Sequence, residues 1–231
     1  MSSVLTLANI RASVLDRADM TDSSFPVTAR VTEVINNALG ELYDIITTCF
    51  ETYHYKTGDI SVVSGTQSYS LPTDLYKIIR VYFKDSAGNL ERPLIECDLD
   101  NLCLQSTDSL ATTAEVKNLR YKIAGDKIWF SPMPSGSGTV QLWYVPEFTK
   151  LSAESDTMPF KMPVHWEEYI YVAAAIPLLD REESDSGALR ATKAELEGKI
   201  RAAVQVRNVS GPFRIKNRRG RRVGLQWPHA R

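Results

Sequence analysis

The sequence predicts an α+β protein: an antiparallel helical bundle with an inserted antiparallel β unit and an extended basic C-terminal arm. Three observations lead to this fold class. Apolar residues recur at spacings of three and four before residue 57 and again after residue 163, as they do along amphipathic helices. Between these regions the apolar period changes to two, which is typical of strands. From residue 209 onward the chain has seven Lys or Arg residues and no Asp or Glu.

These patterns divide the chain into four expected segments. We expect the N-terminal helices of the bundle in residues 1–57 and the β-rich unit in residues 58–150. The C-terminal helices should occupy residues 151–208, and the arm residues 209–231. With 231 residues, of which 43% are hydrophobic, the chain is large enough for one sizeable core or two unequal ones.

The N-terminal region predicts two helices. Residues 3–18 should form a short one, with apolar side chains over one broad side. Pro26 suits the first turn of the next helix, where its missing N–H costs nothing, and the pattern continues to about His54. We expect the apolar seam of this long helix in the core: Val31, Ile35, Ala38, Leu42, Ile45 and Cys49.

The middle of the chain predicts strands joined by short turns. Residues 60–62 and 69–71 alternate around a turn at residues 64–67, which is a hairpin signal. Tyr76–Lys84 is β-branched and aromatic and predicts a strand, followed by a turn at residues 85–89 and an extended piece that ends at Pro93-Leu94.

Residues 96–105 then predict a short helix, and residues 106–118 a polar loop. A tight turn at Gly125-Asp126 separates the first two of the remaining strands. Because the connections are of hairpin length, the β unit should be antiparallel. The strands expected here are Arg120–Ala124, Lys127–Ser131 and Thr139–Val145.

The C-terminal region predicts two more helices. Pro163 opens the first, with Glu167 and Glu168 in the first turn, where acids favour the helix dipole. From residue 169 to residue 179 this helix is apolar on nearly every side, so we expect burial all round, with part of the cover supplied by a neighbouring copy. Pro177 should kink or end it, at a cost of ~3 kcal/mol.

The final helix should run from about Ser186 to Arg207. The pairs Glu195–Lys199 and Glu197–Arg201 have the favourable spacing of one helical turn. Its buried face should comprise Leu189, Leu196, Ile200, Ala203 and Val204.

Several classes of protein find no support in the sequence. No stretch approaches the ~18 uninterrupted apolar residues of a transmembrane helix, so we expect no membrane partner. The N-terminus does not have the pattern of a secretory signal. The cysteines are odd in number and form no CxxC pair, which predicts neither a disulfide framework nor a zinc site: Cys49, Cys97 and Cys103.

Catalytic motifs are also missing from the sequence. It has no GxxxxGK[ST], GxGxxG or HExxH motif, and its histidines (His54, His165 and His229) share no ligand-like spacing. Glu182 and Glu183 are adjacent, so they do not face each other as a catalytic carboxylate pair would. We therefore predict no enzyme, no cofactor and no metal.

The net charge of −1 conceals an uneven distribution. Taking the seven cations of the arm from the 27 Lys and Arg of the chain leaves 20 against 28 Asp and Glu, so the body carries −8 and the arm +7. The arm is too short and too rich in Gly and Pro to bury a core of its own. It could bind a protein groove, bind nucleic acid or serve as a solubilising end. Its Trp and its aliphatic residues favour a protein groove, while its preference for Arg over Lys suits contacts with either carboxylates or phosphates.

Three segments, taken in order, resemble the head-to-tail adaptor proteins of tailed bacteriophages, and especially the tail accessory factors beneath the portal of short-tailed phages. They are LPTDLYKIIRVYF, YKIAGDKIWFSPMPSGSGTVQLWYVPEFTKL and PVHWEEYIYVAAAIPLLDREESD, and the resemblance spans residues 27–207. The residues that carry it most specifically are Ile123, Gly125, Asp126, Ile128, Phe130, Pro132, Pro134, Tyr144, Arg181, Glu182, Glu183 and Asp185.

The resemblance implies a virion structural protein that assembles in the host cytoplasm and functions at the head–tail interface. Its expected partners are the portal protein, a tail nozzle or tail-tube protein, and further copies of itself in a ring, commonly of twelve. Double-stranded DNA would pass through the ring without sequence-specific contacts. The ring would close the DNA-filled head and extend its exit channel, although the free protein could be monomeric.

Two sets of contact residues follow from the resemblance. Subunit contacts are assigned to Arg181, Glu182, Glu183 and Asp185. The arm should bind the portal through Phe213, Arg214, Ile215, Lys216, Arg218, Arg219, Arg221, Arg222, Leu225 and Trp227. Two rival hypotheses stay open: a nucleic-acid-binding protein that uses the basic arm, and a virion-associated cell-wall hydrolase.

Overall fold

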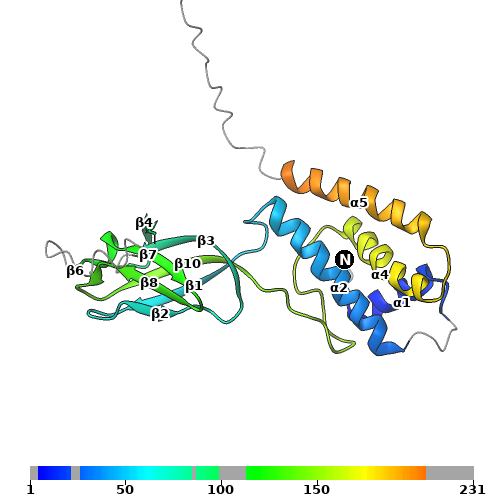
Figure 1. The fold of residues 1–231 in the computed structure, drawn as a ribbon, viewed down its shortest axis with the longest axis horizontal. Helices are drawn as coiled ribbons and strands as arrows, with labels where there is room; N and C mark the ends of the chain where they lie inside the picture. Colours follow the sequence, from blue (N-terminus) through cyan, green and yellow to red (C-terminus); the bar gives the residue numbers. More distant parts are fainter. Residues whose placement is uncertain (1–4, 22–26, 85–86, 99–112, 207–231) are drawn as a thin grey trace, which may run out of the picture.

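The structure is a computed structural model that describes residues 5–21, 27–84, 87–98 and 113–206. Within these ranges it has mixed α+β architecture, with four α-helices at one end and the strands at the other (Figure 1). The chain leaves the helices after α2 (Thr28–Cys49) and returns to them after β10 (Gly138–Pro146). The prediction of a mixed fold with helices and antiparallel sheets is confirmed, whereas the basic arm lies outside the described residues.

The N-terminal helices are shorter than predicted. α1 (Leu7–Arg17) begins where the Thr6 hydroxyl accepts the Asn9 N–H at 3.3 Å, an N-cap that fixes its start. α2 ends at Cys49 because Phe50 is extended, and residues 50–55 lead directly into the first strand. The predicted seam of α2 is confirmed, since five of its residues are buried and Cys49 is half-buried.

α4 (Glu167–Arg181) lies at the centre of the helical core and follows the 3-10 turn η2 (Val164–Trp166). It packs against α1, α2 and α5 (Gly187–Val206). These helices belong to the same chain, so the burial of α4 requires no neighbouring copy. Its buried residues are Tyr169, Ile170, Val172, Ala173, Ala174, Ala175, Ile176 and Leu178.

Pro177 lies inside α4, and the helix continues to Arg181. The missing N–H and the clash of the ring with the preceding turn cost ~3 kcal/mol in a helix. Ile176 and Leu178 on either side are buried, while Pro177 itself is exposed. Burial of the flanking residues offsets the cost. Of the two predicted outcomes, an end of the helix at this proline is wrong, and a kink stays a prediction.

α5 matches its predicted bounds closely. The predicted pairs Glu195–Lys199 and Glu197–Arg201 both form, at 2.6 and 2.7 Å. Ile200 and Val204 are buried as predicted. The rest of the predicted face is less covered than expected, with Leu189 and Leu196 half-buried and Ala203 exposed.

The strands form two four-stranded sheets that share one apolar core. The first sheet has the order β1-β10-β3-β4, with β1 (Lys56–Val62), β3 (Leu75–Lys84) and β4 (Leu90–Pro93). The second has the order β2-β8-β7-β5, with β2 (Ser68–Ser70), β8 (Lys127–Ser131), β7 (Arg120–Ala124) and β5 (Ile95–Glu96). The core between them includes Val62, Val81, Val140, Leu142, Ile128 and Phe130.

The predicted hairpin between β1 and β2 is wrong. β1 pairs antiparallel with β10 along its whole length, from Lys56 opposite Tyr144 to Val62 opposite Gly138, while β2 pairs with β8. The long β10 offers β1 more backbone partners than the three residues of β2 could. The predicted turn at Gly125-Asp126 is confirmed, and Gly125 adopts a φ of +63° that glycine permits without strain.

Two short parallel pairs depart from the predicted antiparallel unit. β5 pairs in parallel with β7, and β6 (Thr113–Ala114) with β9 (Met133–Pro134). β5 and β7 are joined by a connection long enough for a crossover, which the sequence pattern did not reveal. Of the predicted helix at 96–105, Glu96 belongs to β5 and residues 99–105 lie outside the described ranges. Residues 106–112 of the predicted loop also lie outside them, and its remainder contains β6 and η1 (Val116–Asn118).

Candidate partner-binding surfaces

The turn between α4 and α5 contains the four residues predicted for subunit contact. Arg181, Glu182, Glu183 and Asp185 are all exposed, at the end of the helices remote from the strands (Figure 1). Glu183 has a φ of +58°, a left-handed conformation that is uncommon outside glycine. Asp185 accepts the Gly187 N–H at 2.8 Å and so serves the start of α5. Glu182 and Glu183 form no ion pair with a residue that the structure describes.

Asp180 anchors this turn, although the sequence analysis did not select it. Its carboxylate accepts the Ser186 hydroxyl at 2.5 Å and pairs with the Arg190 guanidinium. Arg190 also donates its Nε–H to the Ser186 hydroxyl at 3.0 Å. The hydrogen bond from Ser186, followed by the one from Arg190, holds the pKa of Asp180 below its usual range. In the sequence, Ser186 and Arg190 are one helical turn apart, and this spacing could have indicated that they act together.

The ten predicted portal contacts in the arm, from Phe213 to Trp227, lie outside the described residues. The last residue that the structure describes before the arm is Val206. α5 ends at Val206, whose side chain is 62% exposed.

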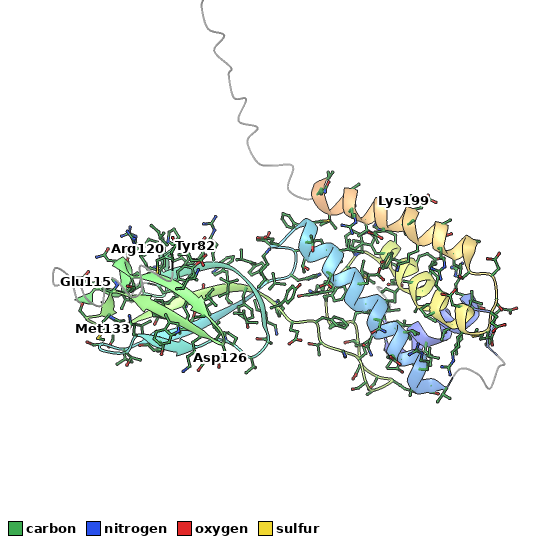
Figure 2. All side chains as sticks on the ribbon, viewed as in Figure 1. Tyr82, Glu115, Arg120, Asp126, Met133 and Lys199 are labelled. Carbon is green, nitrogen blue, oxygen red and sulfur yellow. The ribbon has the colours of Figure 1, made fainter. Side chains whose placement is uncertain are left out.

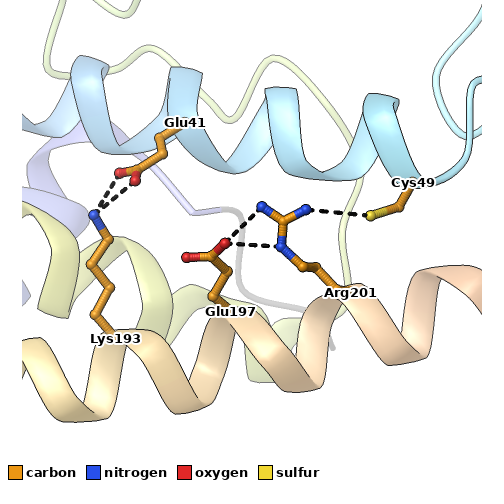
Figure 3. A network of polar contacts seen from close by, with 5 residues as sticks. All are labelled: Glu41, Cys49, Lys193, Glu197 and Arg201. Atoms are coloured by element: carbon orange, nitrogen blue, oxygen red, sulfur yellow. Dashed lines mark hydrogen bonds and ion pairs between the residues drawn. The ribbon is translucent and has the colours of Figure 1, made fainter.

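A polar seam joins α5 to α2 (Figure 3). Lys193 binds both carboxylate oxygens of Glu41 at 2.8 Å, and Arg201 donates to the Cys49 sulfur at 3.9 Å. Arg201 also donates twice to Glu197, at 2.7 and 2.9 Å. Because residues 193 and 201 meet residues 41 and 49 in the same order, α2 and α5 run parallel.

Tyr169 of α4 lies beside this seam. Its ring is fully buried, and the Lys193 ammonium lies 5.9 Å from the ring centre, within the range of a cation–π contact. Burial raises the pKa of Tyr169, and the nearby carboxylates of Glu41 and Glu197 raise it further. The hydroxyl therefore stays protonated at neutral pH.

An aromatic cavity of about 620 Å³ lies between the helices and the strands, and we call it the junction pocket. Its walls come from α2, the segment after α2, the end of β10 and the connector to α4. Ring centres lie 4.6 Å apart for Tyr53 and His54 and 5.1 Å apart for His54 and Phe160. The lining residues are Tyr43, Tyr53–Lys56, Pro146–Thr149 and Met158–Pro163.

Hydrogen bonds fix the walls of the junction pocket. The Tyr43 hydroxyl donates to the Pro146 carbonyl at 2.7 Å. Burial raises the pKa of Tyr43 to about 12, with a smaller contribution from the Asp44 carboxylate. Lys56 pairs with Asp74 at 2.7 Å, and Asp74 also accepts the Tyr144 hydroxyl at 2.9 Å. Sequence reasoning missed this pocket because its residues come from three segments distant along the chain.

The family of the chain follows from comparison with known proteins. Residues 5–216 match the family described as SU10 adaptor protein. The chain belongs to the SU10 adaptor protein family. This match covers nearly the whole chain and agrees with the resemblance to phage head-to-tail adaptors in the sequence. No curated protein matches the chain.

This SU10 adaptor family member also carries an aromatic cluster beside its first sheet, in which Tyr55 is exposed and Tyr82 and Trp143 are half-buried. Tyr55 stacks on Trp143 with ring centres 5.0 Å apart, and Tyr82, labelled in Figure 2, meets the edge of Trp143 at 5.9 Å. The Trp143 N–H donates to Gln141 at 3.1 Å, which holds the indole in place. The rings therefore form an ordered surface, of a composition common in protein interfaces.

Apolar residues are also exposed at the end of the β strands away from the helices, where Figure 2 labels Met133. Met133 and Val63 are 39% and 52% exposed. The Gly65 N–H binds the Pro134 carbonyl at 3.0 Å, which brings their two segments together. For an adaptor, this end offers a second surface for contact with another protein.

The described residues contain neither a metal-binding cluster nor a membrane-spanning helix. No group of three or more His, Cys, Asp or Glu side chains is placed to hold a metal ion in the described ranges. None of the helices that the structure describes is long and apolar enough to cross a membrane. The described cysteines, Cys49 and Cys97, are free thiols.

Proposed function

We propose that this SU10 adaptor family member is a virion structural protein that assembles as a ring at the head–tail interface of a tailed phage. The family match over residues 5–216 is the observation that carries the proposal. In this role the protein binds the portal, closes the DNA-filled head, extends its exit channel and receives a nozzle or tail-tube protein. The function is architectural, without catalysis.

The ring requires two different surfaces on each copy, because a cyclic assembly is built from head-to-tail contacts. We assign one of them to the α4–α5 turn, with Arg181, Glu182, Glu183 and Asp185. The exposed Glu182 and Glu183 lack a partner among the described residues of their own chain, which leaves them available to a neighbour. Twelve copies are expected, with the helices in segments 1–57 and 151–208 and the β unit in segment 58–150.

The arm, residues 209–231, is proposed to attach the ring to the portal. Phe213 and Trp227 would fill apolar pockets, while its arginines pair with portal carboxylates. Fixing each residue costs about 1–2 kcal/mol of backbone entropy, so the arm can dock only on a surface that offers many contacts. This requirement limits assembly to the portal.

Mass measurement of the full chain mixed with the portal protein of the same phage tests the ring. A complex with a fixed, many-copy stoichiometry is expected, and a complex of variable stoichiometry contradicts the proposal. A chain that stops after Asn208 should not bind the portal stably. Trp227→Ala should dissociate faster, whereas single Arg→Ala changes should mainly alter the salt dependence.

A second candidate function rests on the seven cations of the arm, which could neutralise DNA phosphates. Binding of duplex DNA through all seven would give a log–log slope of ~−6 between affinity and salt concentration. The adaptor proposal expects only weak, sequence-independent binding by the isolated protein. A titration of the full chain with duplex DNA at several salt concentrations separates the two functions.

A further inference from the structure

We propose that the junction pocket is the docking site for Phe213 and Arg214 of the same chain. The start of the basic arm would then fold back onto the body until a partner displaces it. This inference rests on the proposed function only in treating the arm as the segment that binds a partner.

The chemistry of the pocket fits an aromatic side chain next to a guanidinium. Its volume of about 620 Å³ lies within the range of protein cavities that bind ligands. Tyr53, His54 and Phe148 are only half-buried, so their rings remain available to an occupant. Aromatic rings attract another ring through edge or offset contacts and a guanidinium through their faces.

The described chain ends at a suitable place for this contact. Arg201 reaches the sulfur of Cys49, the last residue of α2, and α5 then continues for five residues to Val206. At 1.5 Å per residue this extends about 7 Å beyond Arg201, and α5 ends on the side of the helices that faces the strands (Figure 1). From Val206 to Phe213 an extended chain spans up to ~25 Å. The arm has only to pass the end of α2.

Charge favours the same occupant. The helical parts of the body, residues 5–55 and 147–206, contain 10 Lys and Arg against 18 Asp and Glu, while the arm carries +7. Near the pocket, Asp44 and Glu147 are exposed and form no ion pair with a described residue. Lys161 also lines the pocket and opposes a cation, whereas the charge of Lys56 is neutralised by Asp74. Arg214 would lie beside Asp44 or Glu147.

Two methionines make the pocket observable in the full-length protein. Met158 and Met162 line it, whereas Met20 is buried in the helical core and Met133 lies at the far end of the strands. In a chain labelled with ¹³C at the methionine methyl groups, Phe213→Ala should shift the Met158 and Met162 resonances, because the ring current of Phe213 is lost. The Met20 and Met133 resonances should not move.

Matched arm variants complete the experiment. Arg214→Ala should give a smaller shift of the same two resonances, and Leu225→Ala none. The proposal is overturned if Phe213→Ala leaves Met158 and Met162 unmoved, or if Trp227→Ala moves them instead. It is also overturned if the shift depends on protein concentration, since the occupant would then belong to a second copy.

Portal attachment is measured separately on the same proteins. Failure of the wild-type chain to bind the portal would contradict the proposed function and leave the methyl result standing. Conversely, if the methyl resonances do not move and the chain still binds the portal, only the proposed docking of the arm in the junction pocket is contradicted.

Discussion

α4 and α5 are neighbours in the sequence and in space, yet they are held in different ways. α4 has 15 residues and buries eight of them, whereas α5 has 20 residues and buries only Ile200 and Val204. α5 packs on the core through these two residues and the half-buried Leu189 and Leu196, and polar contacts tie it to α2 and to Asp180 at the turn.

Two adjacent helices can therefore differ in the free energy needed to detach them from the rest of the protein. Removing α4 would expose the helical core, because apolar burial contributes ~25 cal/mol for each Å². Removing α5 would expose only two fully buried residues, Ile200 and Val204, and would break ion pairs that are each worth only about 0–1 kcal/mol. Of the two helices, α5 should therefore be the easier to detach.

The largest difference is expected between matched core substitutions in the two helices. Ile170→Ala should lower the free energy of unfolding by about 2–5 kcal/mol, since Ile170 is fully buried in the centre of the core. Ile200→Ala should fall at the lower end of this range, about 2 kcal/mol, because α5 can shift to fill the space. Urea unfolding of both variants tests this, and equal losses would contradict the distinction.

Substitution of Pro177 should increase the stability of the protein, the opposite of the core substitutions. Pro177→Ala restores a backbone N–H within α4 and should stabilise the protein by up to ~3 kcal/mol. The exposed position leaves room for the substitution. An Ala191→Pro variant in exposed α5 is the matched control and should destabilise that helix. Thermal unfolding measures both, and an unchanged or lower midpoint for Pro177→Ala would show that the surroundings have adapted to proline.

The polar seam should make a smaller contribution. Lys193→Met removes the pair with Glu41 and should cost about 0.5–1 kcal/mol, since Lys193 is only 26% exposed. Amide hydrogen exchange should become faster in α5 but not in α4, because only α5 depends on the seam. Lys199→Met, at an exposed pair on the same helix, is the control and should leave exchange nearly unchanged. Faster exchange throughout both helices would mean that they open together.

The smallest effect on the stability of the protein should come from Asp180, at acid pH. The pKa of Asp180 is lower in the folded protein than in the unfolded chain, so its contribution to stability is present above the unfolded value of about 3.9 and is lost as the pH falls through the folded value. Asp180→Asn should reduce the loss of stability below about pH 4. Asp156→Asn is not a matched control. Backbone N–H groups lower the pKa of Asp156, whereas the side chains of Ser186 and Arg190 lower the pKa of Asp180. Unfolding curves at pH 7 and pH 3 would reveal the difference.

Elements with strong local patterns were predictable from the sequence. The seam of α2, the bounds of β7 and β8, and the two ion pairs of α5 follow from spacings of a few residues. The partner of β1 did not follow, because β10 lies about 80 residues away and a local turn at residues 64–67 indicated β2 instead. The parallel pairing of β5 with β7 was not predictable either, because residues 97–119 separate the two strands.

The candidate binding surfaces also differ in whether they could be predicted from the sequence. The exposed acids of the α4–α5 turn could be selected because they belong to a sequence segment that resembles the phage adaptors. The junction pocket could not, because Tyr43, His54 and Phe160 come together only when the helices and strands are assembled. The aromatic surface of Tyr55, Trp143 and Tyr82 likewise depends on the pairing of β1 with β10 and β10 with β3.

The pairing of β1 with β10 has a mechanical consequence. The chain enters the strands through β1 and leaves them through β10, and Lys56 lies opposite Tyr144 where both meet the helices. The strands are thus carried on two tethers that are hydrogen-bonded side by side. Asp74 links the tethers further, because it pairs with Lys56 of β1 and accepts the Tyr144 hydroxyl of β10. A single tether would allow the strands to swivel about it, whereas two adjacent tethers resist torsion and share any tension. The aromatic surface on the sheet therefore keeps its direction relative to the helices when the ends of the molecule are pulled apart.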